Sequence, residues 1–401
     1  MSAQQPSPRV VITALGFAQI LAWGTSFYFP AVLATPIVAD TGWSLAWVVV
    51  GTSIGLLVAG LISPQVGRLV QDKGGRPVLA ASSVLFAAGL AGIGLAPTLP
   101  FYLVAWIVLG AGMGCGLYDA AFAALGRLYG HGARGPITNL TLFGGFASTV
   151  CWPLSAFLAN TFGWREACLV YAAMHLVVAL PLQLVMPAGR AHEANHGADD
   201  APAKSAPSET RALAHERLVL VLLALVMTIA AGIGSIVVVH LLIFLQARGV
   251  ELAMAVTFGT LFGPAQVGAR VLERLFGQHY HPIWTMIASC VLMFVGLLLL
   301  MVSAPILGLA ILLYGAGYGI SWIARGTLPL ALFGPQRYPI LIGRLAFPSL
   351  IAQALSPALG ALLLDHSGAD ATIAVLTLFA AVNLAVIGLL WRECRTRLSS
   401  P

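Results

Sequence analysis

Long apolar runs separated by short polar segments divide this chain along its whole length. Each run has roughly the 20 residues that a helix needs to cross the hydrocarbon core of a bilayer. The runs lack strict apolar–polar alternation, and a backbone in lipid must satisfy its own hydrogen bonds, so they predict helices and not barrel strands. Twelve spans are expected, at residues 10–33, 45–66, 78–95, 101–125, 137–159, 166–185, 218–245, 252–272, 283–302, 306–332, 340–364 and 371–391.

The composition is that of a chain mostly buried in lipid. Of its 401 residues, 59% are hydrophobic and 8% are charged, whereas a soluble domain carries about 25% charged residues. Basic residues are dispersed between the apolar runs, so the net charge of +6 does not indicate a nucleic-acid partner. The cysteines lack ligand spacing and are interpreted as packing residues, with no metal or cofactor implied. They are Cys115, Cys151, Cys168, Cys290 and Cys394.

One polar stretch separates the runs into two sets of six. Residues 188–216 are rich in charged residues, Ala, Pro and Ser, and this composition predicts a solvated linker that is disordered over part of its length. The expected organisation is an N-terminal six-helix bundle over 1–187, a cytoplasmic linker over 188–216, and a C-terminal six-helix bundle over 217–401.

The two sets of runs resemble each other in sequence. Gln65-Val66-Gly67 matches Gln266-Val267-Gly268 at a shift of 201, and Asp72-Lys73 then falls on Glu273-Arg274. Two glycine runs, at 110–114 and 315–319, match at a shift of 205, and glycines at this spacing let helices approach closely. The repeat predicts an all-α membrane protein with twelve transmembrane helices in two pseudo-symmetric six-helix bundles.

The distribution of Lys and Arg predicts the orientation. If both termini are cytoplasmic, only Arg165 and Arg248 of the 20 basic residues lie on the outer side. The opposite orientation would violate the excess of Lys and Arg on the cytoplasmic side in nearly every loop. We therefore expect a multi-pass protein of the inner (cytoplasmic) membrane with cytoplasmic N- and C-termini.

These features resemble the major facilitator superfamily of secondary transporters, and the resemblance covers essentially the whole chain. The turn after span two in that family usually reads Gly-x-x-x-Asp-Arg-x-Gly-x-Arg. Here residues 67–76 read Gly-Arg-Leu-Val-Gln-Asp-Lys-Gly-Gly-Arg, with the acid one place late. Gly163-Trp164-Arg165 is similar to the family's Gly-Trp-Arg turn before span six. The resemblance implies alternating access to a central cavity lined by spans one, four, seven and ten.

Two branches of the superfamily were compared with the sequence. Thr41-Gly42-Trp43-Ser44 and Val239-His240-Leu241-Leu242 look like segments of the monocarboxylate and oxalate–formate branch. That branch also has a substrate-binding Arg in span eight, where this chain has Phe262 and Pro264, and a Lys in span eleven that has no counterpart here. The drug/proton antiporter branch fits no better, because Trp106 occupies the place of its span-four Arg.

Charged residues within the spans need an explanation, because each costs about 2.5–3.5 kcal/mol at the centre of a bilayer. Asp119 in span four is interpreted either as a proton or cation site facing the cavity, or as an acid that pairs with Arg76 or Lys73 and closes the cytoplasmic end. Further candidates for gating or proton coupling lie near the cytoplasmic ends of spans, at Asp72, Arg76, Glu273 and Arg344.

Two arginines are the main candidates for substrate binding. Arg325 in span ten falls at nearly the same depth as Asp119 by the repeat, and Arg270 lies about one turn before Glu273. If they point inward, they suit an anion through charge-assisted hydrogen bonds. The alternative is that they extend to the headgroups or pair with Glu273 and Asp119.

Uncharged polar and aromatic residues complete the predicted pocket. In span one, Gln19, Trp23 and Ser26 fall at i, i+4 and i+7, on one face of a helix. Because the resembled family lines its cavity with spans one, four and ten, the candidates also include Tyr28, Tyr118 and Tyr314. Plain packing is the alternative for each aromatic ring.

His240, toward the outer end of span seven, is a candidate for both substrate binding and proton coupling. Histidine changes its charge near neutral pH, so it can carry a coupled proton. A hydrogen bond within the bundle is the alternative.

The sequence therefore predicts a secondary active transporter that moves a small organic or inorganic anion across the inner membrane, coupled to protons or by exchange. The first alternative is a proton-coupled exporter of amphipathic drugs or toxic compounds, and the second is a transporter-like sensor or scaffold without flux. Since neither a nucleophile–base pair nor a nucleotide-binding loop occurs in the sequence, an enzyme is not expected. The expected partners are the substrate, protons and membrane lipid, with the protein a monomer.

Overall fold

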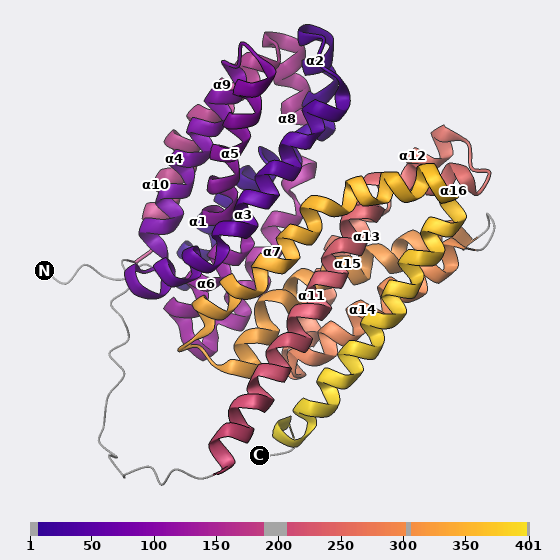
Figure 1. Cartoon of the computed structure of the whole chain (residues 1–401). Helices are drawn as coiled ribbons and strands as arrows, with labels where there is room; N and C mark the ends of the chain where they lie inside the picture. Colours follow the sequence, from indigo (N-terminus) through magenta and orange to yellow (C-terminus); the bar gives the residue numbers. More distant parts are fainter. Residues whose placement is uncertain (1–6, 188–206, 302–305, 399–401) are drawn as a thin grey trace, which may run out of the picture.

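The computed structural model describes residues 7–187, 207–301 and 306–398, and the regular elements in these ranges are helices (Figure 1). The N-terminal half contains α1 (Pro8–Gly24), α2 (Pro30–Thr41), α3 (Leu45–Lys73), α4 (Gly75–Gly94), α5 (Leu99–Gly116), α6 (Tyr118–Tyr129), α7 (Arg134–Gly145), α8 (Ala147–Phe162), α9 (Trp164–Met174) and α10 (Leu180–Leu184). The C-terminal half contains α11 (Pro207–Ala247), α12 (Leu252–Thr260), α13 (Phe262–Phe276), α14 (Pro282–Leu300), α15 (Leu307–Phe333) and α16 (Tyr338–Leu398).

These helices account for the predicted spans. In the described ranges, nine helical stretches are long and apolar enough to cross a membrane. Two of them, Leu99–Phe162 and Tyr338–Arg395, have 64 and 58 residues, enough to cross twice. The chain of α16 turns back at Gly368, whose φ of 76° lies in the left-handed region that favours glycine.

Spans one and four are not continuous helices, although the sequence predicted each as one run. The first breaks between α1 and α2, where the hydroxyls of Thr25 and Ser26 bond back to the carbonyls of Leu21 and Ala22. Pro30 then begins α2 and has no N–H to continue the earlier helix. The second breaks at the extended residue Leu117, between α5 and α6. The two breaks lie near the middle of the molecule, where discontinuous helices can present polar groups.

The linker is shorter than predicted. Helix α11 begins at Pro207, within the segment that was assigned to the linker, because this part of the sequence is rich in the helix formers Glu, Arg, Ala and Leu. Its described side chains are tied to the bundle, with His215 3.4 Å from Glu393 and Glu216 2.8 Å from Arg337. The rest of the predicted linker, 188–206, lies outside the described residues.

The two halves repeat the same internal packing. In the N-terminal half α5 packs against α3 and α4, and in the C-terminal half α15 packs against α13 and α14. The glycine runs make these contacts close. A Cβ on Gly110 would lie 2.6 Å from the carbonyl oxygen of Gly55, and one on Gly319 would lie 2.6 Å from that of Gln266. The predicted role of the repeated glycines is therefore confirmed.

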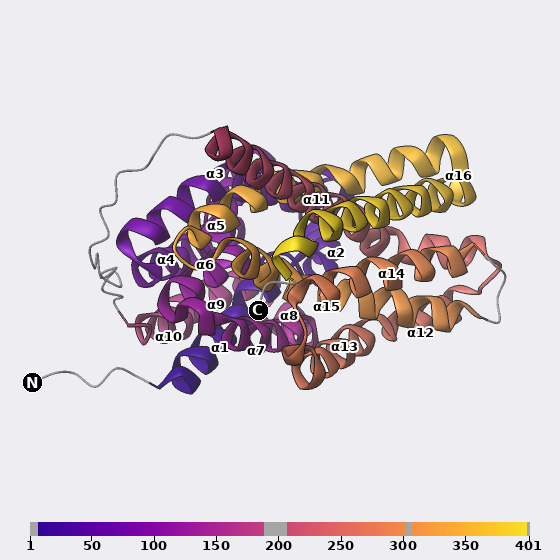
Figure 2. The ribbon, with the colours of Figure 1, turned by 90° about the horizontal axis from the view of Figure 1, so that it is seen from below.

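The halves meet through equivalent pairs of helices. Helix α3 packs along α16, and α7 packs against α13; α7 and α13 lie side by side at the boundary in Figure 2. The hydrogen bonds and ion pairs that join the halves in the described ranges lie toward the end that carries the linker, whereas α2 and α12 diverge at the other end (Figure 1). The structure is therefore closed at the linker end.

Candidate functional site

A buried ion pair joins the two halves near the middle of the molecule. Nε and Nη2 of Arg325 donate to the two carboxylate oxygens of Asp119 over 2.8 and 2.9 Å. The side chains are 7% and 14% exposed, so the charges are largely shielded from solvent. This planar two-point contact is the strongest geometry available to an arginine and a carboxylate.

The break in span four places the acid of this pair. Because α5 ends at Gly116, Asp119 lies in the first turn of α6, where the helix dipole favours a negative charge. The amide of Gln19 donates to the carbonyl of Gly116 over 2.6 Å and satisfies a group at the end of α5. The predicted candidate Gln19 thus supports the break that positions Asp119.

The Asp119–Arg325 pair is one of the alternatives that the sequence left open for the arginines, whereas the other partners considered are not used. Asp119 contacts neither Arg76 nor Lys73, because α6 directs it across the boundary to α15. Arg270 does not pair with Glu273 either. It donates instead to Thr141 O over 2.7 Å and to Gly319 O over 3.0 Å.

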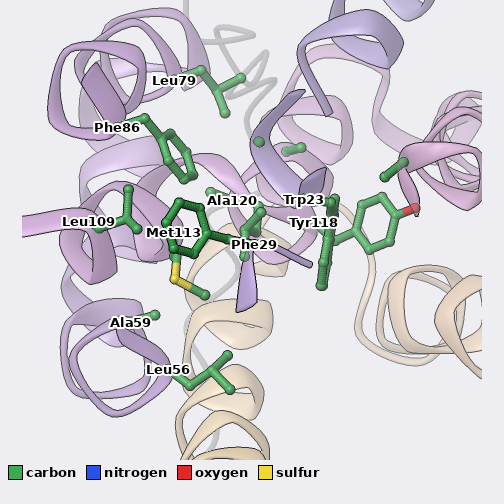
Figure 3. Close-up of a cluster of buried hydrophobic side chains, with 14 of the residues drawn as sticks. Trp23, Phe29, Leu56, Ala59, Leu79, Phe86, Leu109, Met113, Tyr118 and Ala120 are labelled. Atoms are coloured by element: carbon green, nitrogen blue, oxygen red, sulfur yellow. The ribbon is translucent and has the colours of Figure 1, made fainter. Parts of the chain in front are cut away.

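A cluster of aromatic rings lies beside Arg325 of the ion pair. Trp23 lies 5.0 Å from Tyr118 and 5.4 Å from Trp322, measured between ring centroids. Trp23 and Tyr118 lie next to each other at the edge of the buried cluster in Figure 3, and the Tyr118 hydroxyl donates to Thr141 O over 3.2 Å. The guanidinium carbon of Arg325 is 5.5 Å from the Trp322 ring. Trp322 therefore lies next to the charged pair and contacts two rings of the other half, Trp23 and Tyr118.

Two pockets lie on either side of Trp322. The first lies within the C-terminal half and is lined by Met227, Ala230, Ala231, Met286, Tyr318, Ser321, Trp322, Arg325 and Gln353. The second lies between the halves and is lined by Trp23, Ala59, Ser63, Met113, Gly114, Leu117, Tyr118, Asp119, Trp322 and Leu350. Arg325 faces the first pocket and Asp119 the second, so the ion pair connects two small spaces.

Arg270 is a second buried cation at the boundary. It is 3% exposed, and its donors go to two carbonyl oxygens and to Oε1 of Gln266, with no acid as a partner among the described residues. Its charge acts on the hydroxyls of Tyr28, Tyr118 and Tyr318. A buried charge without an opposite charge is costly, so Arg270 makes this region favourable for an anion.

A second layer of contacts closes the linker end. Arg134 donates to Gly277 O over 2.5 Å and to Tyr280 O over 2.6 Å, and it lies 3.8 Å from Glu273. Arg274 donates to Oδ1 of Asn139 over 2.6 Å. Burial and the charge of Arg134 lower the pKa of the nearby His281 below its usual value. Among the predicted gating residues, Glu273 belongs to this layer.

Other predicted residues lie away from the ion pair. Ser26 bonds only to its own helix, and the Tyr314 hydroxyl has no partner within the C-terminal core. Nε2 of His240 lies 3.0 Å from Pro357 O, between α11 and α16. Tyr28 packs edge-on against Trp152 at 6.2 Å.

The remaining predicted gating residues are at the surface. Asp72 and Arg344 are exposed and Arg76 is half-buried, and none of the three has a hydrogen-bond or ion-pair partner among the described residues. They therefore contribute nothing to either layer of contacts in this state.

The sequence analysis missed the residues that shape the first pocket. Trp322 lies three residues before Arg325 on α15, and so on the same helix face; this spacing could have identified it. Gln353 was visible as a polar residue in an apolar span. Only the packing of α16 against α14 and α15 shows that it reaches the pocket.

Metal binding has no support in the described ranges, where no three His, Cys, Asp or Glu side chains cluster.

Two similar helical halves that meet at a buried ion pair define a membrane transport protein of the two-bundle class. This chain belongs to the Major Facilitator Superfamily, whose family model matches residues 15–328.

Individual relatives are distant. An uncharacterized 38 kDa protein encoded in a 23S RNA operon of Thermoproteus tenax is 33% identical over 181 residues. That match covers 45% of this chain and 47%, about half, of that protein.

Among solved structures, the human organic anion transporter MFSD10 matches 96% of this chain and 100% of its own, with 15% identity and a TM-score of 0.70. The transporter FucP in the outward conformation matches 95% of this chain and 97% of its own, with 16% identity and a TM-score of 0.73. Another FucP structure is described as that of the E. coli fucose:proton symporter. These likenesses show the fold alone.

Proposed function

We propose that this protein is a secondary active transporter that moves a small organic or inorganic anion across the inner membrane by alternating access, coupled to protons or by exchange. The observation that carries the proposal is the pair of buried arginines at the boundary: Arg325 pairs with Asp119, whereas Arg270 has no acid as a partner among the described residues. The anion transporter MFSD10 has a similar fold, which agrees with this choice of substrate class.

The charge balance favours an anion over a cation or a neutral solute. Arg325 is neutralised by Asp119, whereas Arg270 is held, within the described ranges, only by oxygen atoms of uncharged groups. An anion that reaches this region gains a charge-assisted interaction that the empty protein lacks. A cation would meet an uncompensated positive charge in a poorly solvated site.

The contacts at the linker end fit one state of an alternating-access cycle. Opening that end requires the Asp119–Arg325 pair, the Arg134 and Arg274 contacts, and the bond from Ser63 Oγ to Gly343 O to break. In exchange, contacts would form at the end where α2 and α12 now diverge. The similar fold of FucP in the outward conformation agrees with such a state.

The proposed orientation places the linker end in the cytoplasm. Basic residues gather at that end of the helices, including Arg68, Lys73 and Arg127, while Arg165 and Arg248 lie at the other end. This arrangement follows the excess of Lys and Arg on the cytoplasmic side. The protein would then work as a monomer in lipid, with the substrate and protons as its partners. His240 remains a prediction for proton coupling.

Export of amphipathic drugs is the second candidate, and the aromatic rings favour it. Trp23, Tyr118 and Trp322 lie within about 6 Å of one another and could stack on a planar compound. Drug susceptibility of an overexpressing strain distinguishes the two functions. An exporter raises the tolerated concentration of several unrelated drugs, whereas an anion transporter does not.

The direct test is counterflow in proteoliposomes that contain the full chain. Radiolabelled carboxylates, phosphate and sulfate are offered alongside neutral amides and sugars of similar size. We expect uptake of one anion class, lowered at least about tenfold in Arg270→Gln because a hydrogen-bonding charge is lost. Arg68→Gln, which removes an exposed charge from α3, is the control and should transport normally. Uptake of neutral solutes alone would contradict the proposal.

A further inference from the structure

We propose that an anionic phospholipid binds across the outer face of the α3–α16 crossing, with its phosphate held between Arg68 of the N-terminal half and Arg344 of the C-terminal half. The inference is independent of the proposed substrate, because it concerns the surface that faces the bilayer and not the pockets between the helices. It assigns a ligand to two cations that have no acid as a partner among the described residues.

Helices α3 and α16 run antiparallel where they cross. A Cβ on Gly60 would lie 3.2 Å from the Cβ of Leu350. A Cβ on Gly67, about two turns further along α3, would meet the carbonyl oxygen of Pro339 near the start of α16. Residue numbers therefore rise along α3 as they fall along α16.

The crossing places Arg68 and Arg344 on the same flank. The residues before them face each other, since a Cβ on Gly67 would lie 3.3 Å from the Cα of Gly343. A right-handed helix turns about 100° per residue. In an antiparallel pair, the residue that follows each of two facing residues therefore turns to the same side of the contact. Two arginines from different halves thus border one stretch of surface.

This flank faces the bilayer. Arg68 lies on an exposed stripe of α3 that includes Leu61, seven residues earlier, whereas Ala59, which packs against α5, lies on the opposite side of the helix. On α16, Arg344 and the exposed Phe347 lie on one face. Exposed apolar side chains of a membrane protein contact acyl chains. The surface therefore offers an apolar bed for acyl chains beside a pair of cations.

Both arginines reach the depth of the lipid headgroups. Arg68 lies five residues before the end of α3 at Lys73, and Arg344 lies six residues after the start of α16 at Tyr338. At 1.5 Å per residue, each is about 7–9 Å from its helix end. A long arginine side chain extends from that depth toward the headgroups, where it meets the phosphate of a lipid.

The charge of this surface selects an anionic headgroup. The exposed Arg337 nearby pairs with Glu216, whereas Arg68 and Arg344 pair with no described acid. Asp72, one turn beyond Arg68, is exposed and is not among the ion pairs of the described residues either. Guanidinium groups bind phosphate through parallel charge-assisted hydrogen bonds. A zwitterionic lipid brings its own cation to the same surface and therefore gains less.

A lipid bound in this way joins the two halves at the linker end. Its phosphate contacts one arginine from each half, so separation of α3 from α16 breaks one of the two contacts. A ligand that binds one state more tightly than the other shifts the equilibrium toward that state. Anionic lipid therefore favours the state that is closed at the linker end.

Thermal unfolding of the full chain in detergent tests the inference, with dioleoyl-phosphatidylglycerol as the probe. Dioleoyl-phosphatidylcholine is the control for headgroup charge, and inorganic phosphate is the control for the acyl chains. We expect phosphatidylglycerol to raise the apparent melting temperature of wild type by several degrees, in a saturable way. Phosphatidylcholine and inorganic phosphate should leave it unchanged. Hydrogen exchange at 277–281, at the same end, should slow with phosphatidylglycerol alone.

A double-mutant cycle distinguishes one bridging lipid from two separate contacts. Arg68→Gln and Arg344→Gln should each lower the apparent affinity for phosphatidylglycerol at least about tenfold, and the double variant should lose little more than either. Arg344→Lys keeps the charge without the two-point contact and should lose less. Arg217→Gln removes an exposed cation from α11 that pairs with no described acid. It is the matched control and should respond as wild type.

Each outcome decides the inference. It is wrong if phosphatidylglycerol does not stabilise wild type, if both single variants keep the full stabilisation, or if their losses simply add. Equal stabilisation by phosphatidylcholine or by inorganic phosphate also overturns it, because an apolar contact or a free anion then accounts for the effect. So does a dimer that forms without added lipid and dissociates in Arg68→Gln, because a second copy then covers the surface.

Failure of this inference leaves the proposed function intact. The lipid experiments measure unfolding and hydrogen exchange, and none of them involves a transported solute. In vesicles of phosphatidylcholine alone, the surface has no anionic lipid to hold, so Arg68→Gln transports as wild type there. Loss of counterflow in Arg270→Gln and loss of the lipid effect in Arg68→Gln are therefore separate results.

Discussion

Gly67 and Gly343 bring the backbones of α3 and α16 into direct contact across the boundary between the halves. A Cβ on Gly343 would lie 2.5 Å from the carbonyl oxygen of Ser63 and 3.1 Å from the Cα of Gly67. A Cβ on Gly67 would overlap the carbonyl oxygen of Pro339. Closure at the linker end therefore depends on the absence of side chains at this crossing.

Replacement of Gly67 by Ala should destabilise the closed protein. The added methyl group must push α3 away from α16, and overpacking of this kind costs about 1–3 kcal/mol. We expect the apparent melting temperature of the full chain in detergent to fall by several degrees.

Gly268, which occupies the equivalent place in the repeat, is the matched control. A Cβ there meets no atom within 4 Å, and Ala favours a helix over Gly by about 0.5–1 kcal/mol. Gly268→Ala should therefore melt at the same temperature as wild type or slightly higher. Equal losses in the two variants would show that the helix crossing is not the cause.

Arg134→Gln should loosen the linker end. The change removes the charge-assisted hydrogen bonds to Gly277 O and Tyr280 O, each worth about 1.5–3 kcal/mol. Hydrogen exchange at the backbone amides of 277–281 should become at least about tenfold faster, since local opening costs less free energy.

Arg344→Gln serves as the control for charge alone. Arg344 is exposed and has no partner among the described residues, so exchange at 277–281 should match that of wild type. If hydrogen exchange at 277–281 in Arg134→Gln is as slow as in wild type, the hydrogen bonds of Arg134 do not hold the linker end closed.

Thr25→Val should lower stability through a buried histidine. The Thr25 hydroxyl donates its one hydrogen to Leu21 O. Nε2 of His175 lies 2.8 Å from the hydroxyl oxygen of Thr25, so it must be the donor in that contact. Valine leaves that N–H unpaired at a cost of about 1–3 kcal/mol, measured as a lower apparent melting temperature.

Thr257→Val provides the comparison, because the Thr257 hydroxyl is exposed and its only described bond is to Ala253 O of the same helix. Its effect should stay within about 0.5 kcal/mol. If the two variants have the same apparent melting temperature, the Thr25–His175 bond contributes no stability.

Trp322→Leu should change which anions compete for transport. Its ring separates the two pockets, and a smaller side chain joins them into a larger space. Inhibition of counterflow by benzoate and larger acids should increase relative to inhibition by propionate. Trp284→Leu, which removes an exposed ring that contacts Trp391, should leave the ratio unchanged. An unaltered ratio in Trp322→Leu would show that this ring does not limit ligand size.

The candidate site could be predicted from the sequence only in part. Asp119 and Arg325 stand out individually, because a charge in an apolar span is costly wherever it lies. Their pairing depends on how α6 and α15 of different halves are placed, because the two residues are 206 positions apart in the sequence. The sequence left Arg76, Lys73 and the arginines of the other half open as partners for Asp119, because no local pattern specifies a contact between halves.

The sequence by itself determined the membrane class, the apolar spans and the two-fold repeat. Run length, composition and helix period act locally and need no partner to be recognised. Tertiary structure alone decided that Gly67 is crowded while Gly268 is free, and that Gln353 reaches the pocket. It also decided that Arg270 meets no acid in the described part of the chain. These properties depend on the register and distance between helices far apart in the chain, which packing sets after each helix has formed.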